Sequence, residues 1–387
     1  MREELTAEIA EAEAATTPEG KYAVVEKFSQ TFKDIYASKR MYIEVINQVE
    51  DLASMTFELY PDFITDEEND AVVALSDAVW TDYENGTINY DETVEQLKTI
   101  GIKPQIVDGW YEVGTPAQLW YISHIVNNGQ YAINVRLTAD IDLGTASYFP
   151  PIGKQYWPQG PALSFDGIFD GQGHIIYNLR VEKDDAGAET GLFGRLNGAT
   201  IQNLGIVNAT LKNSNALRAG VLGACAVNSK IINCFTTGNI ETNECICSFN
   251  YTNGGGLIGL LTSESVISNS YTTYNTLGND EYSIIENCYW GEEAVAGAPT
   301  GELCYKLNGD QSTITWFQKL GEDAYPVLNA ERGTVIPNED GNYENATGIQ
   351  QIADKKQTGQ IFNLMGQKMQ KVTKGIYIID GKKTLVK

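Results

Sequence analysis

The sequence predicts a mixed fold, with an N-terminal α-helical bundle, a central right-handed parallel β-helix (a β-solenoid) and a small C-terminal β domain. The central prediction depends on five copies of the phrase Ile-x-Asn, which lie between residues 165 and 290. A second phrase, Gly-apolar-apolar-Gly, precedes the middle three copies, and its last Gly lies 9, 10 and 10 residues before the Asn. Short segments of nearly constant length, separated by inserts of variable length, are typical of stacked repeats.

The two phrases also predict how successive coils stack. The Ile-x-Asn copies are at residues 176–178, 201–203, 231–233, 267–269 and 285–287, and the Gly-x-x-Gly copies are at 191–194, 220–223 and 256–259. The segments are short, rich in β-branched residues and bounded by Gly and Asn, which favours strands over helices. We expect the isoleucines to point inward in a column and the asparagines to stack at a bend, because Asn tolerates the left-handed backbone conformation.

The same phrases resemble the GLUG repeat of secreted and surface proteins common in gut Bacteroidetes. Residues 137–143, 151–153 and 165–176 fit the first coils of that family, and the resemblance covers about residues 108–330. It implies a β-solenoid and an adhesin-like or appendage role. It implies no particular activity, because members of the family are mostly uncharacterised.

Four segments of the chain are expected. Residues 1–104 form a helical bundle, 105–332 the capped solenoid, 333–349 a linker rich in Gly, Asn and acidic residues, and 350–387 a C-terminal β domain. Helices are predicted over 21–37, 41–57, 65–85 and 91–100, and Val24, Val25, Phe28, Phe32 and Ile35 lie on one face of the first of these. Hiding this apolar face within the bundle is the simpler interpretation; binding a partner through it is the alternative.

Two local signals mark helix starts, and two caps are expected for the repeats. Thr65 and Glu68 have the spacing of a capping box, and Thr115 followed by Pro116 begins a helix to residue 127. That helix is expected to cover the first coil, and the resemblance to the GLUG family implies a helix plus hairpin within 300–328 that closes the last one. The basic C-terminal segment, with a hairpin turn at Asp380 and Gly381, resembles type IX sorting domains of Bacteroidetes. The resemblance implies recognition by an export or attachment machinery; a small β module packed on the repeats is the alternative.

Composition limits the classes of partner. The formal net charge is −24, with 51 acidic against 27 basic residues, so phosphate backbones and anionic lipid surfaces are repelled and no nucleic-acid partner is expected. No apolar stretch reaches the length of a transmembrane helix. The N-terminus lacks the apolar core of a signal peptide. Either the protein is cytosolic or a leader is missing, and the family resemblance favours the second, an extracellular or cell-surface location.

Asp166, Asp170 and His174 share one coil and are the candidate catalytic residues of the chain. Two carboxylates could act as acid and base or hold calcium, but Asp before Gly is common turn chemistry. We therefore expect no catalytic residue, no metal site and no cofactor. Zinc is not expected, because the chain has two histidines and Cys245-x-Cys247 supplies too few ligands.

Cys225 is expected to point inward beside Leu196 and Leu261. Cys234 and Cys288 are expected to lie about 9–10 Å apart, too far for a disulfide.

The preferred function is that of a secreted or surface-displayed interaction protein, adhesin-like and non-catalytic, binding a host or dietary glycan or a protein. Exposed Tyr271, Tyr274, Tyr289 and Trp290 are the candidate platform for stacking on sugars. The alternative is a polysaccharide lyase or hydrolase of the parallel β-helix class.

Overall fold

The computed structural model of the chain divides into two compact units, Met1–His124 with Leu143–Ala146, and Ile125–Asp142 with Ser147–Lys387. Each unit is described by itself. The residues that the structure describes are 2–59, 61–85, 90–144, 146, 148–154, 163–182, 189–212, 218–241, 254–262, 264–275, 277, 279–281, 283–309, 311–346, 361–362, 368–369, 375–379 and 382–386.

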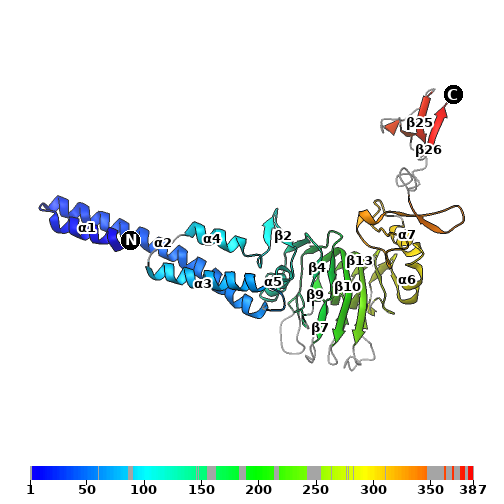
Figure 1. The fold of residues 1–387 in the computed structure, drawn as a ribbon, viewed down its shortest axis with the longest axis horizontal. Coiled ribbons are helices and arrows are strands. Elements are labelled where there is room, and N and C mark those ends of the chain that lie inside the picture. Colours follow the sequence, from blue (N-terminus) through cyan, green and yellow to red (C-terminus); the bar gives the residue numbers. More distant parts are fainter. Residues whose placement is uncertain are drawn as a thin grey trace. The chain divides into compact units, whose positions relative to one another are not determined.

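The first unit is built around one long helix. Helix α2 (Pro18–Leu59) packs against α1 (Arg2–Ala14), α3 (Asp66–Asn85) and α4 (Tyr90–Thr99), and Figure 1 shows α1 and α3 running along it. Its C-terminal half buries Val45, Ile46, Val49 and Leu52, spaced three or four residues apart as on one helix face. The two helices expected over 21–37 and 41–57 are therefore one continuous helix.

The capping box before α3 is confirmed. The Thr65 backbone N–H donates to Glu68 Oε2 at 2.9 Å, and the Glu68 backbone N–H donates to Thr65 Oγ1 at 3.2 Å. The reciprocal bonds satisfy two amide groups that the first helical turn leaves without a partner.

The apolar face predicted for residues 21–37 is partly wrong. Val24, Phe28 and Ile35 are half-buried, but Val25 and Phe32 are 62% and 56% exposed. Their side chains lie away from α1, which contacts α2 through Glu8 and Thr31. The N-terminal half of α2 thus keeps an apolar stripe in solvent.

The first unit also contains the antiparallel pair β1 (Gln105–Val107) and β2 (Trp110–Val113). Helix α5 (Pro116–Asn127) begins as predicted, with the Gln118 backbone N–H donating to Thr115 Oγ1 at 3.2 Å. The residue range of α5 crosses the boundary between the two units.

In the second unit, the strands of successive repeats pair in parallel and in register. Ile201 aligns with Ile231, Ile231 with Ile267, and Ile267 with Ile285. The strands of this ladder and of the segments beside it are β3 (Asn134–Leu137), β4 (Ile141–Asp142), β5 (Ile168–Asp170), β6 (Ile175–Tyr177), β7 (Arg180–Glu182), β10 (Thr200–Lys212), β13 (Lys230–Glu241), β16 (Val266–Ser268), β17 (Tyr271–Thr272), β19 (Ile284–Glu286) and β20 (Tyr289–Trp290).

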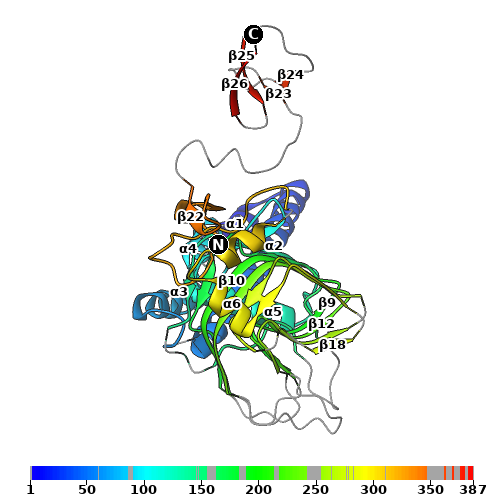
Figure 2. The ribbon, with the colours of Figure 1, turned by 90° about the vertical axis from the view of Figure 1, so that its right-hand side faces the viewer.

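The Gly-x-x-Gly segments lie between two smaller parallel sheets. One is β8 (Glu189–Thr190), β11 (Arg218–Gly220) and β14 (Gly254–Gly255); the other is β9 (Phe193–Asn197), β12 (Gly223–Val227), β15 (Ile258–Thr262) and β18 (Asn279–Glu281). Figure 2 shows β9, β12 and β18 on one side of the repeats and β10 on another. A Cβ on Gly191 would lie 2.1 Å from the Gly220 carbonyl oxygen, so neighbouring repeats approach too closely here for any side chain.

The prediction of a right-handed parallel β-helix is wrong. The described strands are divided among separate sheets that mix parallel with antiparallel pairing, and none of these sheets is closed or forms a solenoid. Long parallel pairing is rare: β10 and β13 align at ten residue pairs, but β13 aligns with β16 at three and with β17 at two. The protein is a mixed α/β structure with seven α-helices in the part that the structure describes. The repeats determine which residues align between neighbours, but the inserts between them differ in length and leave the sheets separate.

The asparagines of Ile-x-Asn all have the left-handed backbone conformation, with φ between 49° and 59°. Asn203 Nδ2 donates to Asp170 Oδ1 at 3.1 Å, and Asn233 Nδ2 donates to Asn203 Oδ1 at 3.2 Å. Asn287 Nδ2 donates to Asn269 Oδ1 at 2.8 Å. Between these two halves Asn233 Oδ1 is buried without a hydrogen-bond partner among the described residues, so the column of amides is interrupted there.

A cap of helices and a hairpin follows the last repeat. Helices α6 (Gly291–Gly297) and α7 (Glu302–Asn308) pack with β13, β17 and β21 (Val335–Pro337) around a core of Phe235, Tyr271, Leu303, Leu307 and Trp316. The 3-10 helix η1 (Ala330–Arg332) leads into β21, which pairs antiparallel with β22 (Tyr343–Asn345). Val335 and Ile336 are buried. Within the range expected to be a linker, the described residues 333–346 thus form a packed hairpin.

The C-terminal segment contains a four-stranded antiparallel sheet in the order β24-β23-β25-β26. Its strands are β23 (Ile361–Phe362), β24 (Lys368–Met369), β25 (Gly375–Ile379) and β26 (Lys382–Val386). The turn residues expected at Asp380 and Gly381 lie outside the described residues, although Ile379 pairs with Lys382 across them.

Candidate functional site

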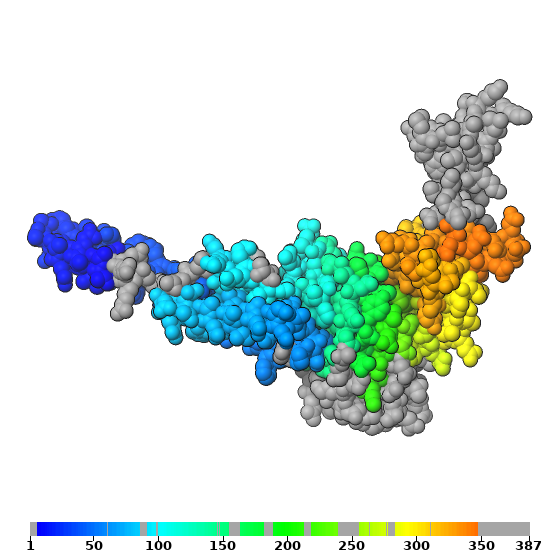
Figure 3. All heavy atoms as spheres, viewed as in Figure 1, coloured from blue at the N-terminus to red at the C-terminus, as the bar shows by residue number. Residues whose placement is uncertain are grey.

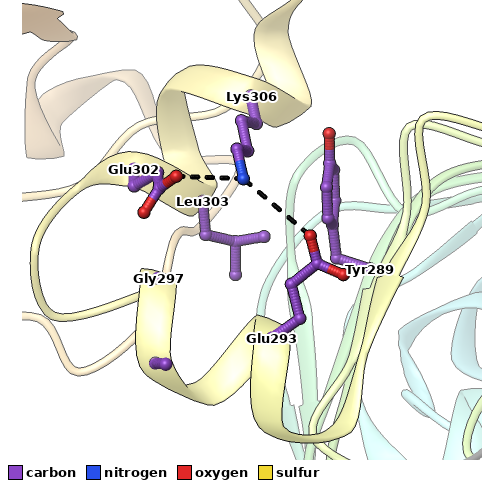
Figure 4. A pocket seen from close by; sticks show the side chains of 7 residues that line it. Tyr289, Glu293, Gly297, Glu302, Leu303 and Lys306 are labelled. Carbon is purple, nitrogen blue, oxygen red and sulfur yellow. Dashed lines mark ion pairs between the residues drawn. The ribbon is translucent and has the colours of Figure 1, made fainter.

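A small open pocket lies where the last repeat meets the cap. Its volume is about 240 Å³, and its lining comes from β20, α6 and α7: Tyr289, Glu293, Ala296, Gly297, Glu302, Leu303 and Lys306. Figure 4 shows the Lys306 side chain reaching between two carboxylates with the Tyr289 ring beside them. The pocket therefore combines an aromatic ring with a cation and two anions.

Lys306 is the central charge of the pocket. Its Nζ lies 3.0 Å from Glu302 Oε1, one helical turn away, and 3.8 Å from Glu293 Oε1. The same Nζ is 5.7 Å from the centroid of the Tyr289 ring. The hydrogen bond to Glu302 raises the pKa of Lys306, and the charge of Glu293 adds to this. Lys306 is therefore held as a cation, whereas a catalytic lysine base needs a lowered pKa.

The Tyr289 side chain is hydrogen-bonded to the last asparagine of the column. Its hydroxyl donates to Asn287 Oδ1 at 2.9 Å, and Asn287 Nδ2 donates both to Asn269 Oδ1 and to the Leu307 carbonyl oxygen of α7 at 3.0 Å. Burial raises the pKa of the Tyr289 phenol, against the lowering effect of Lys306. The last Ile-x-Asn copy thus joins the repeats to the wall of the pocket.

The three residues considered for catalysis have other partners. Asp170 is buried and accepts hydrogen bonds from the Gln172 backbone N–H, Gln202 Nε2 and Asn203 Nδ2 at 2.9, 2.7 and 3.1 Å. His174 Nδ1 lies 3.0 Å from Asp140 Oδ1, which also accepts the Ile175 backbone N–H. Asp170 therefore terminates the asparagine column, and its two oxygens already accept three hydrogen bonds.

Asp166 has a buried side-chain oxygen, Oδ1, without a hydrogen-bond partner among the described residues. Its backbone N–H donates to the Tyr131 carbonyl oxygen at 3.0 Å. Among the described residues no group of three or more His, Cys, Asp or Glu side chains is placed to hold a metal ion.

The aromatic platform proposed from the sequence is wrong at Tyr271. That side chain is fully buried, stacks on Phe235 at 5.3 Å between ring centroids, and donates its hydroxyl to the Pro326 carbonyl oxygen. Tyr274 is half-buried, and burial raises the pKa of its phenol. Tyr289 and Trp290 remain accessible, Trp290 with 42% of its surface exposed.

Four of the cysteines are described, and all four are free thiols. Cys225 is buried but aligns with Arg195 and Leu260, one position away from the predicted neighbours Leu196 and Leu261. Burial raises the pKa of Cys234 to about 12 and that of Cys288 to about 11, so both remain protonated at neutral pH. Cys245 and Cys247 lie outside the described residues.

Glu293, Glu302 and Lys306 were not predicted from the sequence. The spacing of Glu302 and Lys306, four residues apart, is a helical signal. It identifies a surface ion pair but does not indicate that a second acid and an aromatic ring lie beside it.

Comparison with known proteins gives one partial likeness. The chain is 33% identical over 179 residues to halomucin of Haloquadratum walsbyi, a match that covers 43% of this chain and 2% of halomucin. The chain therefore corresponds to a small part of that protein's length. No family model matches the chain, and no solved structure matches it. None of the described helices is both long and apolar enough to cross a membrane.

Proposed function

We propose that the chain is a secreted or cell-surface interaction protein that binds a saccharide, without catalysis, in the pocket between β20 and the cap helices. The observation that carries this proposal is the accessible Tyr289 ring beside Lys306, Glu293 and Glu302. A sugar ring presents C–H groups to an aromatic face and hydroxyls to charged hydrogen-bonding groups at its edge. An open, shallow pocket also fits one residue of a longer glycan.

The charges of the pocket support binding rather than reaction. Lys306 is paired with both carboxylates, so the ammonium group and the carboxylates lie beside the Tyr289 ring before a ligand arrives. Pre-ordered polar groups favour specific recognition because less side-chain entropy is lost on binding. A neutral saccharide suits this site better than an anionic one, because two carboxylates surround one cation.

The wider role follows from the repeat sequence. We propose kinship with the GLUG-repeat proteins, an extracellular or surface location, and recognition of the C-terminal segment by an export or attachment machinery. The antiparallel sheet of β23 to β26 is compatible with a separate recognition module.

The pocket proposal is tested by replacing Tyr289 with alanine and screening both proteins on a neutral glycan array. We expect the variant to lose at least about tenfold in affinity for any glycan that the natural protein binds, because the aromatic face is removed. Tyr305→Ala is the matched control. Tyr305 lies on α7, is exposed and contacts Tyr343, and its loss should leave binding unchanged.

Two results contradict the proposal. One is the absence of any binding glycan, with thermal melts showing that the natural protein is folded. The other is glycan binding that is equally strong in both variants, which would place the site elsewhere.

A further inference from the structure

The N-terminal half of α2 carries an exposed apolar stripe with the spacing of a coiled-coil seam. Tyr22, Val25, Phe32 and Tyr36 are 69%, 62%, 56% and 66% exposed. With Ser29 between them, successive positions are three, four, three and four residues apart, which is the a/d pattern of two helices that pack side by side. The stripe spans about 21 Å at the ordinary rise per residue.

One other face of this half of α2 is occupied by α1. Helix α1 contacts it through the hydrogen bond from Thr31 to Glu8 and the ion pair of Lys27 with Glu11, both at 2.7 Å. Beyond this half, α3 contacts α2 at Lys39, whose Nζ lies 4.7 Å from the centroid of the Tyr83 ring. Helix α1 and the N-terminal half of α2 form the dark-blue part of the surface in Figure 3. Among the described residues none covers the stripe between Tyr22 and Tyr36.

We propose that the occupant of this stripe is the same stripe of a second copy of the chain, running antiparallel. In the antiparallel register that places Val25 opposite Tyr36 of the second copy, Ser29 faces Phe32, so that a small side chain meets a large one. A parallel pair would instead set Phe32 against Phe32 and Ser29 against Ser29.

The charges beside the stripe favour the same register. Glu26 and Lys33 occupy equivalent flanking positions one heptad apart. In the antiparallel pair, Glu26 of each copy lies next to Lys33 of the other, which gives two ion pairs across the interface. A two-fold axis that crosses the seam between residues 30 and 31 generates both of them, and each copy presents the same surface to the other.

The test is the mass of the full chain in solution. We expect a dimer by light scattering after gel filtration, in about 0.5 M sodium chloride so that the repulsion between two copies with a charge of −24 each is screened. Phe32→Glu should raise the dimer dissociation constant by at least about tenfold, because it puts a charge at the centre of the seam. Phe57→Glu is the control: it lies on the same helix, is 87% exposed and is outside the stripe.

A charge exchange tests the orientation. Glu26→Lys and Lys33→Glu should each weaken the dimer by about threefold or more, because like charges then meet, and the double variant should restore it. Dimerisation that the double variant fails to restore overturns the antiparallel register. A chain that stays monomeric at all concentrations overturns the proposal. The other possible occupant, a membrane surface, is tested with phosphatidylserine vesicles. Vesicle binding by the monomer that Phe32→Glu weakens would assign the stripe to the membrane and likewise overturn the proposal.

Discussion

Replacing Trp316 with alanine is expected to lower the free energy of unfolding by about 3–5 kcal/mol. Trp316 is fully buried in the cap and contacts the rings of Phe235 and Tyr271, with centroids 5.8 and 5.5 Å away. Its removal leaves a cavity between the last repeats and helices α6 and α7, where tight packing cannot relax completely. Urea unfolding followed by circular dichroism measures the change.

Trp290→Ala is the matched control for this experiment. Trp290 is the neighbouring tryptophan on the repeat side of the cap and is partly exposed. Its loss should change the unfolding free energy by less than about 1 kcal/mol. Equal destabilisation by the two variants would show that Trp316 is not the centre of the cap core.

The second large effect is expected at Asp170. Asp170→Ala should lower the free energy of unfolding by about 3 kcal/mol, because three hydrogen bonds to a buried carboxylate are lost and the Gln202 and Asn203 amides are left without their acceptor. Asp170→Asn should cost roughly 1 kcal/mol. Its single oxygen can still accept from Gln172 and Asn203, both of which use Oδ1 in the natural protein.

The pair of Asp170 variants also separates structure from catalysis. If the Asp170 carboxylate is structural, the free energy of unfolding of Asp170→Asn is close to that of the natural protein. The free energy of unfolding of Asp170→Ala is then well below both. If Asp170→Ala kept full stability but abolished cleavage of acidic polysaccharides, the structural assignment would be wrong and the lyase or hydrolase hypothesis would gain support.

The alignment of residues between neighbouring repeats could be predicted from the sequence, because it depends on single residues within each repeat. Asn was expected in the left-handed conformation, which is a local constraint that the chain must satisfy wherever it folds. The helix starts at Thr65 and Thr115 were predictable for the same reason, since a cap is formed by side chains within three residues.

The long-range organisation was not predictable in this way. Whether strands join into one wound sheet depends on inserts whose lengths follow no pattern, and the expected β-helix is replaced by separate sheets. Tyr271 was expected outside because it belongs to a repeat, but the cap helices cover it. Conversely, Val25 and Phe32 were expected inside because they are apolar, but α1 is short and occupies a different face of α2.

The pocket was not predicted because its residues come from three elements with unrelated sequence patterns. Tyr289 belongs to the last repeat, Glu293 to α6 and Lys306 to α7. No spacing along the chain connects them. Only the packing of the two helices on the shared core brings the ring and the charges together.

The interrupted column of asparagines has a mechanical consequence. If the repeats are pulled apart along the direction in which they stack, the joint between β13 and the strands β16 and β17 has fewer paired residues than the joint between β10 and β13. Among the described residues it also lacks a hydrogen bond to Asn233 Oδ1 from the next asparagine, Asn269. Under tension this joint should open before the joint between β10 and β13.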